Sequence, residues 1–265
     1  MTDNSSTSQP GTRMRKSARQ DLILTLLSSN PTLRVNQLTD KLNVSAETIR
    51  RDLAELDEAG RINRTYGGAM RSQRFEPHLA ERQALYVSER QQIAQASVEE
   101  IGDADAVLIG GGATVLHFAR ALTSFDRPLT VITMSHSIAP ELAVNPHLQV
   151  VLLPGIYDHR EGIVAGADTI SAIARFHAPV AVLGASGIDA SGVSEAMLTA
   201  SQVYSAVVDH SDRQLILADH SKFARRALML VSPWRDSMVL CTDMPPPPDV
   251  LTAMERNRAQ LKLCP

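Results

Sequence analysis

Arginine side chains gather in a short N-terminal stretch of the sequence and are suited to binding phosphate groups or base edges. Arg50 and Arg51 are adjacent, and Arg64 follows soon after them. An arginine can pair bidentately with guanine or hold a phosphate oxygen, and the free N–H groups at a helix N-terminus can also hold a phosphate. The chemistry indicated by this stretch is nucleic-acid binding.

A second candidate for anion binding is the glycine-rich turn Gly110-Gly111-Gly112-Ala113-Thr114, which follows the apolar run 106–109. Glycine lets backbone N–H groups approach a phosphate, and the dipole of a helix starting at Val115 favours an anion. A turn of this kind also serves as a plain connection between a strand and a helix. We expect Gly111, Gly112, Ala113 and Thr114 at a phosphate site, with the structural turn as the alternative.

Three helices in close succession are predicted to position the arginines. The first spans residues 19–28 before Asn30-Pro31, the second spans 35–42 and ends at Asn43, and the third runs from Ser45 to Ala59 before Gly60. Ser45 is a good N-cap because its hydroxyl can accept a hydrogen bond from a free backbone N–H. The stretch 61–70 predicts a strand that runs into a Gly-Gly turn, which is a compact β-wing.

The third helix has one apolar face. Ile49, Leu53 and Leu56 recur at helical spacing and must face the core. This arrangement turns Glu47 and Arg51 outward and places Thr48 and Arg50 on the flanks. Two adjacent arginines therefore reach solvent.

Beyond residue 90, helical segments alternate with short apolar runs. Strands are expected at 106–109, 129–132, 149–153, 180–183, 214–217 and 238–240, and helices at 91–101, 115–122, 138–144, 169–176 and 201–209. Such alternation predicts a parallel α/β sheet, in which ligands bind at the carboxyl ends of the strands. Pro245–Pro248 is expected to be an extended connector to a final amphipathic helix.

Length and composition favour two globular domains in a reducing compartment. The 265 residues exceed a usual single core, and the two cysteines, Cys241 and Cys264, have no metal-like spacing to any histidine. The net charge of −3 hides an asymmetry: residues 13–74 carry 12 Lys/Arg against 7 Asp/Glu (+5), which leaves 14 against 22 (−8) elsewhere. No apolar run approaches a membrane span and no signal peptide is visible, so a cytoplasmic protein without a membrane partner is expected.

The histidines and carboxylates form no convincing catalytic set, since proton transfer needs convergent groups. Asp158/His159 and Asp219/His220 are adjacent in sequence only, and on an extended segment neighbouring side chains point to opposite faces. We interpret both pairs as loop polarity. No catalytic residue, metal or cofactor is expected.

The string NVSAETIRRDLAELDEAGRINRTYGGA, residues 43–69, closely resembles the helix-turn-helix and wing of the DeoR family of bacterial transcriptional regulators. With this resemblance, DNA contacts are expected from residues of the helices and the wing: Arg34, Ser45, Glu47, Thr48, Arg50, Arg51, Arg64, Tyr66 and Gly67. The wing residues Arg64 and Tyr66 are expected to hold phosphates. A winged helix that only contacts other proteins is the alternative.

The resemblance continues through residue 243 and implies a sugar-phosphate sensor with the fold of ribose-5-phosphate isomerase. The family's ligand loops correspond to residues 110–114, 133–136, 154–166, 184–189 and 218–223. The effector-binding residues implied, together with those of the glycine-rich turn, are Gly111, Gly112, Ala113, Thr114, Ser135, His136, Arg160, Asp189, Tyr204 and Lys222.

The chain departs from the family pattern at positions expected to clamp an anion. Gly110 replaces an acidic residue, Tyr204 replaces the lysine of a Glu-Ala-x-Val-Lys segment, and Asp158 replaces a basic residue. Arg160 and the neighbouring histidine could substitute for the charge lost at Asp158. Lys222 is the best remaining candidate for a phosphate partner.

Together these patterns predict an α/β protein with an arm at 1–17, disordered by composition, a winged helix-turn-helix at 18–72, a linker at 73–90 and an effector-sensing domain at 91–265. The function expected is a ligand-responsive repressor of carbohydrate catabolism genes. Its expected partners are double-stranded operator DNA, a sugar phosphate or related metabolite, and further copies of the chain. Two alternatives stay open: an isomerase-like sugar-phosphate enzyme with a vestigial helix-turn-helix, and a DNA-binding protein whose C-terminal domain only dimerises.

Overall fold

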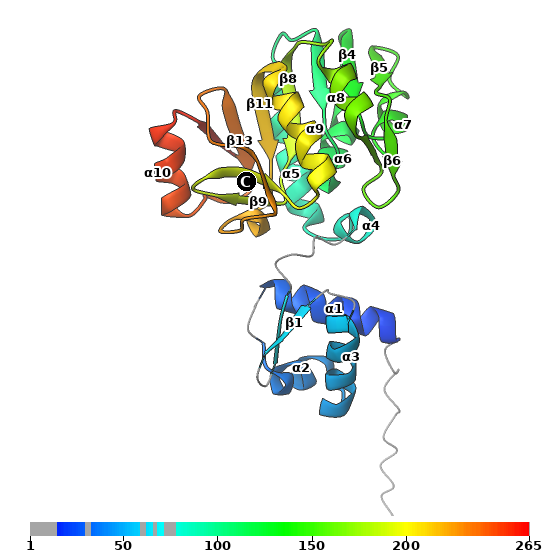
Figure 1. The fold of residues 1–265 in the computed structure, drawn as a ribbon, viewed down its shortest axis with the longest axis vertical. Coiled ribbons are helices and arrows are strands. Elements are labelled where there is room, and N and C mark those ends of the chain that lie inside the picture. The colour runs from blue at the N-terminus through cyan, green and yellow to red at the C-terminus, as the bar shows by residue number, and fades with distance from the viewer. Residues whose placement is uncertain (1–14, 30–32, 59–61, 66–67, 72–77, 265) are drawn as a thin grey trace, which may run out of the picture. The chain divides into compact units, whose positions relative to one another are not determined.

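The structure, a computed structural model, describes residues 15–29, 33–58, 62–65, 68–71 and 78–264 (Figure 1). The chain divides into two compact units, residues 1–75 and 76–265. The predicted N-terminal arm lies almost wholly outside the described residues.

The described part of the N-terminal unit contains the three predicted helices. Its predicted wing, expected as a strand that runs into a Gly-Gly turn, is a two-stranded antiparallel sheet. The elements of the unit are α1 (Lys16–Ser29), α2 (Val35–Leu42), α3 (Ala46–Glu58), β1 (Ile62–Thr65) and β2 (Gly68–Arg71). Leu38, Ile49 and Leu53 are buried in one core cluster. Asn43 ends α2 in the left-handed conformation (φ 51°, ψ 47°), which allows the sharp turn into α3.

Polar contacts fix α3 within this unit. The Thr48 amide donates to the Ser45 hydroxyl at 3.2 Å, so Ser45 caps the helix as expected. Asp52 is buried on α3 and forms an ion pair with Arg19 of α1, with 2.5 Å between Nε and Oδ2. These contacts set the rotation of α3 and hence which of its side chains reach solvent.

The C-terminal unit is built on a seven-stranded parallel sheet of order β14-β13-β11-β8-β3-β4-β5. Its strands are β3 (Ala106–Ile109), β4 (Leu129–Thr133), β5 (Leu148–Leu152), β8 (Ala178–Gly184), β11 (Ser211–Leu217), β13 (Met238–Thr242) and β14 (Gln260–Leu263). The predicted parallel α/β class is therefore confirmed. The prediction missed β14, the strand at one edge of the sheet.

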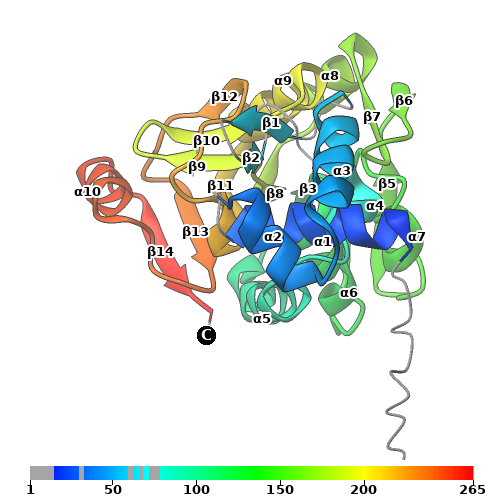
Figure 2. The same cartoon turned by 90° about the horizontal axis from the view of Figure 1, so that it is seen from below.

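Helices cover both faces of the sheet (Figures 1 and 2). One core cluster joins the sheet to α8 (Ala167–Ile173), α9 (Leu198–Asp209) and α10 (Pro248–Arg256). The other joins it to α5 (Val87–Ser97), α6 (Ala113–Leu122) and α7 (Ala139–Leu142). Alternate residues of β3 enter the two clusters: Leu108 the first, Val107 and Ile109 the second.

Smaller elements complete the unit around the carboxyl ends of the strands. They are α4 (Leu79–Arg82), the hairpin of β6 (Ile156–Asp158) and β7 (Ile163–Ala165), and the three-stranded sheet of β9 (Gly187–Asp189), β10 (Gly192–Glu195) and β12 (Met229–Ser232). Two 3-10 helices, Val98–Ile101 and His220–Lys222, complete the set. The segment 73–90 was expected to be a linker with some helical character. Its described part forms α4 and the first residues of α5, and from residue 76 onward it belongs to the C-terminal unit.

Candidate functional site

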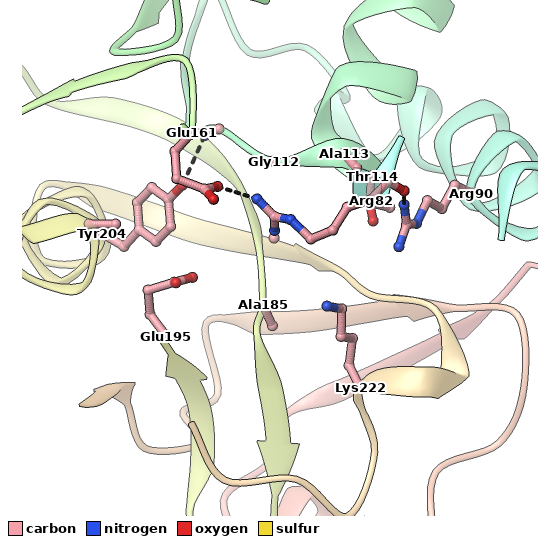
Figure 3. A pocket seen from close by; sticks show the side chains of 13 residues that line it. Arg82, Arg90, Gly112, Ala113, Thr114, Glu161, Ala185, Glu195, Tyr204 and Lys222 are labelled. Atoms are coloured by element: carbon pink, nitrogen blue, oxygen red, sulfur yellow. Dashed lines mark hydrogen bonds and ion pairs between the residues drawn. The ribbon is translucent and has the colours of Figure 1, made fainter. Parts of the chain in front are cut away.

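A pocket lies where β3, β8 and β11, which are neighbours in the sheet, reach their carboxyl ends (Figure 3). As the side chains stand, its cavity volume is about 20 Å³, room for about one water molecule. It is lined by thirteen residues: Arg82, Arg90, Gly111, Gly112, Ala113, Thr114, Glu161, Gly184, Ala185, Glu195, Ala200, Tyr204 and Lys222. This location agrees with the rule that ligands of open parallel sheets bind at the carboxyl ends of the strands.

The glycine-rich turn forms one wall of the pocket and leads into α6. Gly112 is the N-cap of α6 with φ 109° and ψ 164°, a conformation that side-chain-bearing residues rarely adopt. The first N–H groups of a helix have no acceptor within the helix. Ala113 and Thr114 therefore begin α6 with backbone donors at the edge of the pocket.

Tyr204 of α9 packs directly against this turn. Its hydroxyl accepts a hydrogen bond from the Gly111 amide at 3.2 Å. A Cβ added at Gly110 would lie 3.3 Å from Tyr204 Cε1 and 2.8 Å from a Leu183 methyl, and one added at Gly111 would lie 2.5 Å from an Ile163 methyl. Burial raises the pKa of Tyr204, and the charges of Glu195 and Glu161 raise it further, so the phenol stays protonated.

Three buried cations line the pocket. Lys222, Arg90 and Arg82 are 6%, 2% and 9% exposed. Arg90 Nε lies 2.9 Å from Asp219 Oδ2, and Arg82 forms an ion pair with Glu161. Arg90 also donates to the backbone oxygen of Arg82, which ties α5 to α4.

Asp219 sits behind the cations and is fully buried. Its burial acts to raise its pKa, but the charges of Arg90 and Lys222 and hydrogen bonds such as that from Ser221 outweigh it and hold the pKa below its usual value. Our interpretation of Asp219 as loop polarity is therefore wrong. Its neighbour His220 faces elsewhere, with Nδ1 2.5 Å from Asp243 Oδ2.

Of the ten residues expected to bind the effector, the structure brings six to this pocket: Gly111, Gly112, Ala113, Thr114, Tyr204 and Lys222. The other four do not line it. Buried Ser135 bridges to Ile163, and His136 packs edge-on against Tyr157. Asp189 accepts from the Ser191 amide in a hairpin.

Arg160, the fourth, borders a separate hollow of about 350 Å³ beside the β6–β7 hairpin, where Ile156 and His159 also lie. Its amide donates to the Asp158 carboxylate at 2.8 Å. The turn at Asp158 thus separates Arg160 from the pocket, although the next residue, Glu161, reaches it.

Sequence analysis missed four charged residues of the pocket. Arg82 and Arg90 fell in the expected linker. Glu161 fell in the expected ligand loop 154–166 but was not singled out there, and Glu195 fell outside the expected loops. One signal was available, because Arg90 shares the buried face of α5 with Ile93, Ala94 and Ser97 at helical spacing. A charged residue on such a face must find a buried partner.

The residues expected to contact DNA lie mainly on the surface of the N-terminal unit. Arg34, Ser45, Glu47, Arg50 and Arg51 are exposed, and Thr48 is half-buried. The backbone of Arg64 belongs to β1, but its side chain lies outside the described part, as do Tyr66 and Gly67 entirely.

None of the helices in the described ranges is long and apolar enough to cross a bilayer. Within the same ranges, no three His, Cys, Asp or Glu side chains are grouped so that they could hold a metal ion.

A helix-turn-helix unit joined to an α/β unit with a cation-lined pocket defines the class of ligand-responsive transcriptional regulators. Residues 19–75 match the DeoR-like helix-turn-helix domain, and residues 86–244 match the DeoR C terminal sensor domain. The chain belongs to the DeoR family.

Similar proteins agree with this assignment. The Glycerol-3-phosphate regulon repressor of Escherichia coli (strain K12) is 30% identical over 253 residues, which are 95% of this chain and 100% of the relative. The Transcriptional repressor AccR of Agrobacterium fabrum (strain C58 / ATCC 33970) is 31% identical over 233 residues, covering 85% of this chain and 88% of the relative.

Among solved structures, ribose 5 phosphate isomerase A from Neisseria gonorrhoeae aligns with 52% of this chain and 53% of its own at 20% identity. The TM-score of this alignment is 0.37. The family match and the related repressors make this chain a ligand-responsive DNA-binding repressor of transcription and not an isomerase-like enzyme.

Proposed function

We propose that the pocket binds a small phosphorylated carbohydrate or related metabolite, and that binding changes the affinity of the N-terminal unit for operator DNA. The regulated genes are those of carbohydrate catabolism. One relative is named for the glycerol-3-phosphate regulon, which supports a phosphorylated effector.

The observation that carries this proposal is the meeting of Lys222, Arg90 and Arg82 with the start of α6 in one pocket. Buried cations are costly unless anions compensate them, and here carboxylates supply part of that compensation. A phosphate accepts charge-assisted hydrogen bonds from lysine and arginine and backbone hydrogen bonds from a helix N-terminus.

The N-terminal unit is proposed to bind DNA through the exposed face of α3. Arg51 projects from the helix face opposite the buried stripe of Ile49 and Leu53, and exposed Arg50 lies on its flank. An arginine at such a position can read guanine in the major groove. The wing would add phosphate contacts.

Arg82 offers a route from effector to operator. Its helix α4 is the first described element of the C-terminal unit, and it is held to the loop before β7 by the Leu79 amide, which donates to Arg160 O at 3.1 Å. An anion that competes with Glu161 for Arg82 would change how α4 is held, and so bias the segment leading to the DNA-binding unit.

Calorimetry of the full chain with a panel of sugar phosphates tests this function, alongside operator binding with and without each compound. Lys222→Met should weaken phosphate binding by about 1.5–3 kcal/mol, the contribution of a hydrogen bond to a charged group. Arg256→Met removes an exposed positive charge of the same unit and is the matched control. If no phosphorylated compound binds wild type or alters operator affinity, the effector assignment is wrong.

We also propose that the chain acts as a homo-oligomer. One small winged helix makes limited contact with DNA, and dimers gain specificity by reading two half-sites. Ile156 and Leu198 are exposed at 79% and 50%, as apolar side chains covered by a second subunit would be in an isolated chain. Light scattering should give the mass of a dimer or tetramer, and a monomer that binds a single half-site tightly would contradict this.

A further inference from the structure

The pocket has two electrically different ends (Figure 3). Lys222, Arg90 and the start of α6 lie at one end, and Glu161, Glu195 and Tyr204 lie at the other. The guanidinium of Arg82 lies between them and pairs with Glu161. A ligand that fills this pocket meets both positive and negative side chains.

The acidic end is held in place by specific contacts. Glu195 Oε1 accepts hydrogen bonds from the Ser186 hydroxyl at 2.9 Å and from the amides of Ala196 and Met197 at 2.7 and 3.1 Å. A carboxylate offers acceptor positions on both oxygens. Glu195 is thus a fixed anionic group on the pocket wall, and its charge, with that of Glu161, reaches the Tyr204 hydroxyl.

The charges of the pocket already balance before any ligand binds. Arg82, Arg90 and Lys222 contribute three positive charges, and Glu161, Glu195 and the adjacent Asp219 contribute three negative charges. A phosphate monoester adds about −1.5 to −2. A ligand carrying only that charge leaves a negative excess among buried side chains, which is costly.

We propose that the effector is a small phosphorylated metabolite that also carries an ammonium group, with its phosphate at Lys222 and Arg90 and its ammonium between Glu195 and Glu161. This inference rests on the proposed function, because it assumes that the pocket is the effector site. The ammonium offsets part of the phosphate charge. It also donates hydrogen bonds to the carboxylates that are stronger than those from a neutral hydroxyl group. Glu195 and Glu161 are then the residues that determine specificity for the amine.

Matched ligand pairs isolate the ammonium. Calorimetry of the full chain compares glucosamine 6-phosphate with glucose 6-phosphate, and 2-aminoethyl phosphate with 2-hydroxyethyl phosphate. In at least one pair the amine should bind about tenfold more tightly, the effect of one favourable charge interaction of about 1.4 kcal/mol.

Two variants assign that preference to the acidic end. Glu195→Gln keeps an oxygen acceptor for Ser186 and the two amides, and it should reduce the preference towards unity. Tyr204→Lys supplies an ammonium from the protein, so it should also abolish the preference while tightening the hydroxyl phosphate. Glu255→Gln, at an exposed position on α10, is the matched control and should retain the preference.

The outcomes separate this inference from the proposed function. If phosphates bind but amine and hydroxyl partners bind equally in both pairs, the ammonium assignment is wrong and the proposed function stands. If no phosphate binds, the proposed function itself fails. An amine preference that survives in both Glu195→Gln and Tyr204→Lys overturns the placement of the ammonium at the acidic end.

Discussion

The ion pair between Arg90 and Asp219 provides a sharp test of how the pocket is held together. The two side chains are 2% and 0% exposed and come from segments far apart in the chain. Asp219 Oδ1 accepts a hydrogen bond from the Ser221 amide at 3.1 Å. Asp219→Asn keeps an oxygen acceptor for this amide, so the substitution removes the charge with little change of shape. Arg90→Met removes the other charge and keeps much of the apolar stem.

Removing one partner leaves the other charge buried and uncompensated, which costs about 3–5 kcal/mol. For a domain of this size, 1 kcal/mol corresponds to roughly 2–4 °C, so Asp219→Asn should lower the melting temperature by roughly 6–20 °C. The double variant Arg90→Met/Asp219→Asn buries neither charge and should lose much less than the sum of the two single losses.

Trp234 is the sole tryptophan of the chain and is buried in the C-terminal unit, so its fluorescence reports on the unfolding of that unit. The pKa of Asp219 is lowered in the folded state, so its contribution is complete above the unfolded value of about 3.9 and is lost as the pH falls through the folded pKa. The gap between wild type and Asp219→Asn should therefore shrink below about pH 4. This account of a buried ion pair would be refuted if each single variant lost less than about 1 kcal/mol of unfolding free energy at neutral pH and the double variant lost the sum of the two.

Three further substitutions probe other contacts. Arg51→Ala should weaken operator binding by about 1–3 kcal/mol if this exposed arginine reads a base, and unchanged affinity in a folded protein would mean that α3 does not read DNA. Tyr204→Phe should lower the free energy of unfolding by about 1–3 kcal/mol because it leaves the buried Gly111 amide without its acceptor, and Trp234 fluorescence in urea measures the loss. Gly111→Ala should cost about 1–3 kcal/mol because the new Cβ would lie 2.5 Å from the Ile163 methyl, and a variant as stable as wild type would argue against this packing.

Sequence reasoning succeeded where the determinants are local. The apolar run at 106–109 has the same bounds as β3, and Ser45 caps α3 as its hydroxyl predicted. Periodicity and capping act over a few residues, so a single sequence displays them. The hairpin strands β6 and β9 were not predicted, because each has only three residues and too few to show alternation.

The pocket was only half predictable, because its charged members pair across the chain. Arg90 and Asp219 are 129 residues apart, and Arg82 and Glu161 are 79 apart. No spacing rule connects residues at such distances until the sheet order places β8 between β11 and β3. The glycine turn and Lys222 could be expected from local motifs. The charged residues that pair with one another around them could not.

The replacements at positions 110 and 204 make physical sense only together. Taken one at a time, Gly110 and Tyr204 each looked like the loss of a charged group. In the structure the Tyr204 ring lies so close to Gly110 that a Cβ there would crowd it, and the tyrosine hydroxyl accepts from Gly111. The Gly111 amide is thus already engaged, so a phosphate would meet the later donors at Gly112, Ala113 and Thr114, where α6 begins. An aromatic ring therefore lies against this turn, with Glu161 and Glu195 beside it. A ligand that carries a positive charge as well as a phosphate would disturb the charge balance of the pocket less than a phosphate alone.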